Sequence, residues 1–312
     1  MRNFSDRLYD SVRRAKNPIV VGLDPRIEKL PNGLIASETA PNAEQAAAGF
    51  SLFCRGVIDV VASLVPAVKP QAAFFEQLGP AGMTALAETI AYARGKGLLV
   101  ILDGKRNDIG STAEAYAKAY LGAPPASIWG ADALTVSPYL GDDSLQPFVD
   151  QATSCEAGIF VLVKTSNPGG RTFQDLVSDG RHVYEYVADQ VENLALKSLG
   201  ECNYGVVGAV VGATYPAQLA SLRAAIRHGW FLVPGFGTQG GSAQDVAAAF
   251  DENGFGAVIN SSRAIIFAHQ RPEYKDNFGD NRWQEAVEAA TCDMIDQLYA
   301  ETPASRLVSS MD

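Results

Sequence analysis

Four charged residues lie within six positions directly after the apolar run Leu99–Leu102: Asp103, Lys105, Arg106 and Asp108. An ammonium group beside carboxylates can stabilise a negative charge that develops on a substrate and then donate a proton to it. A simpler explanation is a salt bridge between Asp103 and Lys105, with Asp108 as a helix N-cap. That explanation does not account for two carboxylates that flank a lysine at a strand end. We therefore interpret this segment as part of a candidate active site.

A second lysine and a third aspartate occupy similar positions. Lys69 and Asp24 each come directly after an apolar run. Taken alone, Lys69 is explained as a strand-edge lysine with its amine in solvent, and Asp24 as a turn residue. If the runs are neighbouring parallel strands, however, their ends meet at one edge. The sequence therefore predicts that Lys69 lies close to Asp103 and Lys105.

The segment Pro234–Gly241, PGFGTQGG, is the best candidate for a phosphate site. Its glycines let the backbone approach a ligand and direct N–H groups at an anion. The segment also runs into a helical pattern, whose N-terminus favours negative charge. Arg263, one loop further on, can bind a phosphate bidentately. A flexible turn with a surface arginine is the alternative.

Eight short apolar runs, each ending in polar or glycine-rich residues, must position these side chains. They are Ile19–Leu23, Val65–Val68, Leu98–Leu102, Ala131–Val136, Gly158–Val163, Val206–Val211, Trp230–Val233 and Gly256–Ile259. Since they are apolar on both faces, they are typical of buried parallel strands. Segments with helical spacing lie between or after them: Ala43–Leu64, Gly82–Gly97, Ser111–Leu121, Ser144–Ser154, Val183–Leu199, Ala217–His228, Ala243–Phe250 and Trp283–Tyr299.

This alternation predicts a single (β/α)8 TIM barrel that spans residues 1–312 as one domain. We expect an N-terminal helical extension and a loose C-terminal tail from Pro303 to Asp312. A doubly wound open sheet is the alternative, but no GxGxxG motif follows the first apolar run. In a TIM barrel the active site lies at the C-terminal ends of the strands, where the charged residues above fall.

Composition excludes several function classes. The 312 residues carry a formal net charge of −10, which argues against generic binding to nucleic acid or to an anionic membrane. No apolar run approaches the roughly 18 residues of a membrane-spanning helix, and the N-terminus has no signal-peptide core. The four cysteines and three histidines form no metal-binding motif. We expect a cytoplasmic protein with reduced thiols, no metal and no partner nucleic acid.

In combination, these motifs resemble the orotidine 5′-phosphate decarboxylase family, in its longer bacterial (type 2) subfamily. The resemblance covers about residues 18–268. It rests on GLDPR (Gly22–Arg26), VKPQAAFFEQLG (Val68–Gly79), LDGKRNDIGST (Leu102–Thr112), KTSNPGG (Lys164–Gly170), PGFGTQGG and NSSR (Asn260–Arg263). It implies a cofactor-free decarboxylation of orotidine 5′-phosphate to UMP in pyrimidine biosynthesis, by a homodimer with composite sites.

The resemblance also implies residue roles. Lys105 would protonate C6 after carbon dioxide leaves, and Asp103 would lie near the substrate carboxylate. Lys69 would link Asp103 to the ribose hydroxyls. The remaining implied substrate contacts are Asp24 at the ribose, Ser166 at the pyrimidine edge, Gln239 and Arg263 at the phosphate, Pro234 and Ser262 as further contacts, and Asp108 and Thr112 from the partner chain.

Two other function classes stay open on the sequence alone. One is a different phosphate-binding barrel enzyme, such as a sugar-phosphate aldolase or epimerase, many of which need a divalent metal. Lys69 and Lys164 could in principle form a Schiff base in such an enzyme. The other is a non-catalytic barrel that binds a nucleotide.

Overall fold

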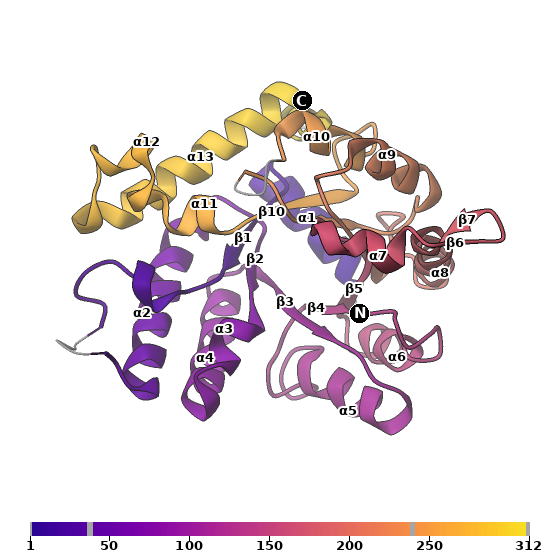
Figure 1. The fold of residues 1–312 in the computed structure, drawn as a ribbon, viewed down its shortest axis with the longest axis horizontal. Coiled ribbons are helices and arrows are strands. Elements are labelled where there is room, and N and C mark those ends of the chain that lie inside the picture. The colour runs from indigo at the N-terminus through magenta and orange to yellow at the C-terminus, as the bar shows by residue number, and fades with distance from the viewer. Residues whose placement is uncertain (1, 36–39, 238–240, 310–312) are drawn as a thin grey trace.

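Eight parallel strands close into a barrel in the computed structural model, which describes residues 2–35, 40–237 and 241–309 (Figure 1). Their order around the barrel is β1-β10-β9-β8-β5-β4-β3-β2. Their bounds are Ile19–Leu23 (β1), Ala67–Pro70 (β2), Leu99–Arg106 (β3), Ala133–Val136 (β4), Gly158–Lys164 (β5), Val207–Val211 (β8), Phe231–Val233 (β9) and Ala257–Ser261 (β10). The predicted TIM barrel is confirmed.

The strands coincide with the eight predicted apolar runs, but four of them, β2, β3, β5 and β10, end one to four residues later than predicted. β2 includes Lys69 and Pro70, and β3 continues through Asp103 to Arg106. The expectation that these charged residues follow their strands is therefore wrong. The backbone pairing of β2 and β3 continues past the apolar runs, because Gln71 forms a bridge with Asp103. Most of the residues in this last part of the strands, at the open end of the barrel, have polar side chains.

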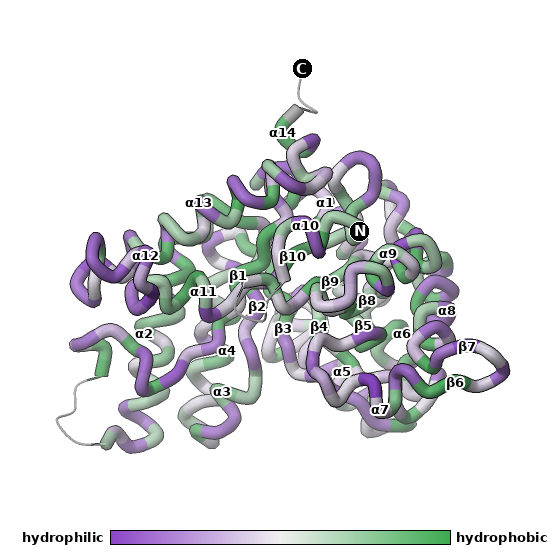
Figure 2. The backbone as a smooth tube through the Cα atoms, turned by 45° about the horizontal axis from the view of Figure 1, so that its top comes forward, coloured by the Kyte–Doolittle hydropathy of each residue, from purple (hydrophilic) through white to green (hydrophobic). Residues whose placement is uncertain are grey.

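Helices surround the barrel, and the hydrophobic residues gather on the strands that they enclose, while hydrophilic residues gather at the periphery, for example around α12 (Figure 2). The helices are Phe4–Ala15 (α1), Ala43–Val61 (α2), Ala72–Glu76 (α3), Gly79–Gly95 (α4), Gly110–Tyr120 (α5), Gln146–Ser154 (α6), Arg171–Gln174 (α7), Val183–Leu196 (α8), Pro216–Ala225 (α9), Ala243–Val246 (α10), Arg263–Ile266 (α11), Pro272–Lys275 (α12), Trp283–Glu301 (α13) and Arg306–Ser309 (α14).

Several short elements were not predicted. They include the helices α3, α7, α11, α12 and α14 and a hairpin of Val177–Ser178 (β6) with Arg181–His182 (β7). Elements of two to five residues are too short to show a hydrophobic period in the sequence. The predicted helix Ala243–Phe250 is also shorter than expected, because a 3-10 turn at Ala247–Ala249 follows α10.

Helix α1 covers the N-terminal end of the barrel. Phe4 packs edge-to-face against Phe160 of β5, with ring centroids 6.2 Å apart. A Cβ on Gly158 would lie 2.2 Å from the Phe4 ring, so only glycine at that position lets the helix approach β5 this closely. With this end occupied, the C-terminal end of the barrel is the one left for a ligand.

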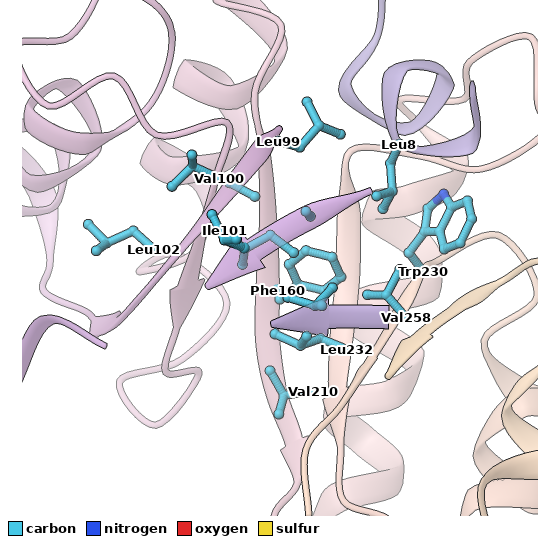
Figure 3. Close-up of a cluster of buried hydrophobic side chains, with 14 of the residues drawn as sticks. Leu8, Leu99, Val100, Ile101, Leu102, Phe160, Val210, Trp230, Leu232 and Val258 are labelled. Atoms are coloured by element: carbon cyan, nitrogen blue, oxygen red, sulfur yellow. The ribbon is translucent and has the colours of Figure 1, made fainter. Parts of the chain in front are cut away.

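The barrel interior is filled with side chains rather than open. Figure 3 shows Phe160 among Val210, Leu232 and Val258, with Leu8 of α1 next to Trp230. These residues belong to one continuous buried core. Such packing makes the barrel a rigid support for the residues at its rim.

The expectation of a loose C-terminal tail is wrong for the residues that the structure describes. Ala304 and Leu307 are buried in the main core. The Thr302 hydroxyl accepts the Ala304 N–H at 3.1 Å, and the Arg306 guanidinium donates to the Glu252 carbonyl. The two apolar side chains gain enough burial to hold the segment against the barrel.

No helix in the described part of the chain is long and apolar enough to cross a membrane.

Candidate active site

A pocket of about 660 Å³ opens at the C-terminal ends of the strands. Most of the predicted site residues line it: Asp24, Lys69, Asp103, Lys105, Ser166, Pro234, Ser262 and Arg263. Side chains more than 200 positions apart in the chain therefore meet in one cavity. This is the place where the barrel fold was expected to put them.

Asp103 lies between two lysines on the pocket wall. Its Oδ2 accepts from Lys69 Nζ at 2.7 Å, and its Oδ1 accepts from Lys105 Nζ at 2.5 Å. Lys69 and Asp103 are only 4% and 7% exposed, whereas the Lys105 side chain is 47% exposed. The inner ion pair is thus sequestered, and the outer ammonium faces the cavity and solvent.

Two further donors, Gln71 and Thr135, complete the shell around Asp103. Gln71 Nε2 donates to Oδ2 at 3.0 Å, and the Thr135 hydroxyl donates to Oδ1 at 2.9 Å. Charge-assisted hydrogen bonds of this kind fix a carboxylate in one orientation. Asp103 therefore points a fixed negative charge into the pocket.

An irregularity between β3 and β4 brings Lys105 next to Asp103. Leu102 pairs with Leu134 and Arg106 with Val136, so that Thr135 alone stands opposite three residues of β3. Lys105 has φ 45°, a left-handed backbone that costs a non-glycine residue free energy. The Thr135 hydroxyl accepts the Lys105 N–H at 2.9 Å and so compensates part of this cost.

Thr135 is not among the site residues predicted from the sequence. It lies inside the apolar run Ala131–Val136, and a polar residue near the end of that run was the only signal. Nothing in the sequence reveals that three residues of β3 stand opposite it. The role of Gln71 was missed for the same reason, although it lies in the quoted motif VKPQ.

The two buried charged groups, Asp103 and Lys69, favour their ionised forms together. Burial acts to raise the pKa of Asp103, but the charges of Lys69 and Lys105 outweigh it and hold that pKa well below its usual range. Burial acts to lower the pKa of Lys69, but the negative charges of Asp103 and Asp24 outweigh it and raise that pKa. The buried pair therefore stays ionised at neutral pH.

Three buried polar atoms on the pocket wall have no hydrogen-bond partner among the described residues. They are Asp24 Oδ1, Arg26 Nε and Asn260 Oδ1. Buried polar atoms are costly when unpaired. Their common location indicates that a polar ligand supplies the missing partners.

The glycine-rich segment forms the opposite side of the pocket. Gly235 and Gly237 have φ values of 100° and 79°, which favour glycine. Gly22 is required for another reason, because a Cβ there would lie 1.8 Å from the Ser262 Oγ. Pro234, Gly235 and Phe236 line the cavity together with Ser262 and Arg263. Gln239 lies outside the described residues.

The structure does not bring Asp108 and Thr112 into the pocket of their own chain; neither is among the described residues that line it. Asp108 Oδ1 accepts the Ile109 N–H at 2.8 Å, and Thr112 is exposed on α5. The simpler explanation of Asp108 as the N-cap of α5 is wrong, because Ile109 holds that position without a side-chain cap.

Lys164, the other lysine considered for Schiff-base chemistry, does not line the described pocket. It is buried and paired with Asp175. Within the described ranges, no three His, Cys, Asp or Glu side chains form a group that could hold a metal ion.

Comparisons with known proteins agree with this geometry. The model of the orotidine 5′-phosphate decarboxylase / HUMPS family matches residues 18–275. An orotidine 5′-phosphate decarboxylase of Rhodopirellula baltica is 57% identical over 300 residues, which cover 96% of this chain and 99% of the relative. One from Caldicellulosiruptor bescii is 39% identical over 88% of this chain and 93% of the relative.

Solved structures resemble the chain over nearly its full length. A structure from Toxoplasma gondii has a TM-score of 0.80 at 30% identity and covers 99% of both chains. An OMP decarboxylase of Leishmania donovani has a TM-score of 0.72 at 34% identity, over 96% of this chain and 98% of that chain. Given these matches in sequence and fold, the chain belongs to the orotidine 5′-phosphate decarboxylase / HUMPS family.

Proposed function

We propose that this chain decarboxylates orotidine 5′-phosphate to UMP and carbon dioxide, without a cofactor, as a step of pyrimidine biosynthesis. The observation that carries the proposal is the array of Lys69, Asp103 and Lys105 on the pocket wall. The named activity of relatives up to 57% identical supports it.

The proposed reaction uses Lys105 as the proton donor. The bond between C6 and the carboxylate carbon breaks, and its electron pair stays on C6 as carbon dioxide leaves. The Lys105 ammonium stabilises this charge and gives C6 a proton. Because its side chain is 47% exposed, the resulting neutral amine can regain a proton from solvent.

Asp103 is proposed to lie beside the substrate carboxylate. Four donors hold its charge in place: Lys69, Gln71, Lys105 and Thr135. Repulsion between the two carboxylates is relieved as carbon dioxide leaves, which lowers the barrier relative to the bound substrate.

The other predicted residues bind the rest of the substrate in this proposal. Lys69 and Asp24 contact the ribose hydroxyls, and Ser166 contacts the pyrimidine edge. Arg263 and Gln239 hold the phosphate, and Pro234 and Ser262 make further substrate contacts. Since the phosphate lies away from the reacting carbon, its binding energy can favour closure of the site around the ring.

We also propose a homodimer in which Asp108 and Thr112 reach the partner's site. Neither residue lines the described pocket of its own chain. Ile109 and Tyr139 lie exposed on the loops that follow β3 and β4, and exposed apolar side chains of this kind favour association.

An assay with purified protein and orotidine 5′-phosphate tests the activity. We expect loss of the orotate-ring absorbance at the same rate with and without EDTA. A rate that EDTA abolishes would instead support a metal-dependent sugar-phosphate enzyme. Absence of turnover by folded protein would contradict the proposal and leave a nucleotide-binding barrel.

A further inference from the structure

Lys164, at the end of β5, is a fully buried lysine that the proposed reaction does not use. Its side chain is 1% exposed, and its ammonium donates to Asp175 Oδ1. The rings of Tyr184 and Tyr215 lie 5.4 Å and 5.1 Å from the Nζ atom. A buried charge needs such compensation, so this environment is built around the lysine.

A register irregularity explains why Lys164 points away from the pocket. Residues two apart on a strand normally face the same side, which would place Lys164 with Leu162 on the pocket wall. Leu162 pairs with Val210, but Lys164 pairs with Val211, so β5 contains one extra residue. A bulge of this kind re-aims side chains. Leu162 lines the pocket, whereas Lys164 reaches Tyr184 of α8.

The ion pair closes the segment Thr165–Asp175, which we name the β5 loop. A second set of contacts, one residue inside this ion pair, also joins the two ends of the loop. Gln174 Oε1 accepts the Thr165 N–H at 3.0 Å, and Gln174 Nε2 donates to Thr165 Oγ1 at 2.8 Å. His182 Nδ1 lies 3.1 Å from the Asp175 carbonyl oxygen and holds that end of the loop. The two ends of the β5 loop are therefore tied together.

The β5 loop carries part of the pocket wall. Thr165, Ser166 and Asn167 all line the cavity. A Cβ on Gly212 would lie 2.8 Å from the Ser166 backbone nitrogen, so Ser166 sits against a position that only glycine allows. The Gly212 N–H donates to the Lys164 carbonyl at 2.7 Å, which joins the base of the loop to the end of β8. Movement of the loop ends would therefore move Ser166.

We propose that Lys164 and Asp175 are positioning residues, whose partly buried ion pair latches the β5 loop so that Ser166 meets the pyrimidine ring of the ligand. This inference rests on the proposed function and adds a specificity element to it. The latch controls recognition of the base, and the ribose and phosphate contacts lie on other strands. Loss of the latch therefore weakens the binding of ligands that carry the base more than the binding of ligands that lack it.

The test compares two competitive inhibitors, UMP and ribose 5-phosphate, in the variant Asp175→Ala. We expect the inhibition constant of UMP to rise about tenfold, the effect of one lost charge-assisted hydrogen bond. The constant of ribose 5-phosphate should stay within about twofold, since its contacts are distant from the latch. KM for orotidine 5′-phosphate should rise in parallel with the UMP constant.

A second variant keeps the test valid if an unpaired buried Lys164 prevents folding. Lys164→Met combined with Asp175→Leu replaces the pair with apolar side chains, an exchange that proteins tolerate. It should show the same selective loss for UMP. Asp179→Asn removes an exposed charge four residues further along the chain and serves as the matched control, with no expected change.

The latch would be overturned if the inhibition constants of UMP and ribose 5-phosphate rose equally in these variants, or if neither constant rose. Failure of the proposed function looks different, because the wild-type protein itself would then not consume orotidine 5′-phosphate. If the wild type decarboxylates orotidine 5′-phosphate but the variants show no selective loss of UMP binding, only the latch is contradicted.

Discussion

Asp103 organises the candidate site at the scale of single residues. One carboxylate accepts hydrogen bonds from four side chains, two of them lysines. This arrangement keeps a negative charge where the substrate carboxylate is proposed to bind. It also sets the lysine on the solvent side, Lys105, in place for proton transfer.

The sequence predicted the charged members of this array and missed the neutral ones. Charge at a strand end is visible in a sequence, so Lys69, Asp103 and Lys105 were found from their positions after apolar runs. Thr135 and Gln71 became recognisable only once the pairing of neighbouring strands was known. Side-chain contacts depend on register, which local sequence patterns do not specify.

The stability of the protein should depend on pH through Asp103. Its pKa lies below the ordinary value of 3.8, so it contributes stability that is present above that value and is lost as pH falls through the lowered pKa. We expect Asp103→Asn to lower Tm at pH 7, and this difference from wild type to shrink as pH falls below about 4.

Thermal unfolding followed by circular dichroism at pH 7 and pH 3 measures this difference. A Tm difference that stays constant, or that grows at low pH, would show that Asp103 is not stabilised in its charged form.

At the scale of elements, two strand irregularities shape the pocket. In β3 an irregularity places Asp103 and Lys105 opposite Thr135, and in β5 an extra residue turns Lys164 away from the cavity. Both lie at the C-terminal ends of their strands, where function rather than the core decides the side chains. The apolar runs predicted the strands correctly but placed the ends of β2, β3, β5 and β10 too early, because apolar periodicity carries no information about polar strand residues.

Thr135 should act on the rate through the position of Lys105. Thr135→Val keeps the shape but removes the hydroxyl that bonds both the Asp103 carboxylate and the Lys105 N–H. We expect kcat to fall about tenfold or more with a smaller change in KM, since one misplaced proton donor acts mainly on the chemical step. Steady-state kinetics with orotidine 5′-phosphate measure this split.

Thr135→Ser is the matched control, because it retains the hydroxyl. The serine variant should therefore keep most of the wild-type kcat, unlike the valine variant. If Ser and Val variants lose activity equally, the methyl group matters and the hydrogen-bonding role is wrong.

At the scale of the whole molecule, the barrel separates stability from chemistry. Helix α1 and the packed interior occupy one end, and the pocket occupies the other. The alternation of apolar runs and helical segments was enough to predict this architecture. It was not enough for the tail, where Ala304 and Leu307 pack into the core without any periodic pattern that marks them.

A complementation experiment tests the composite site of the proposed homodimer. Lys105→Ala and Asp108→Ala subunits should each be inactive alone. A mixed dimer contains one site with both defects and one with neither, so about half of the normal activity per mixed dimer should return. Co-expression with two affinity tags isolates the mixed dimer for assay.

No recovered activity in a verified mixed dimer would place Asp108 in the site of its own chain. Dimers that contain only one of the two variants, prepared in the same way, provide the baseline activity.

The most direct test of the account is the initial rate of orotidine 5′-phosphate decarboxylation by the wild-type protein and by Lys105→Ala, followed by loss of the orotate-ring absorbance. We predict rapid turnover by the wild type and a rate at least about 1,000-fold lower for the variant, since a positioned general acid and its charge are lost together. Circular dichroism should show the same fold for both, because the Lys105 side chain is half exposed. A variant rate close to that of the wild type would contradict the assignment of Lys105 as proton donor.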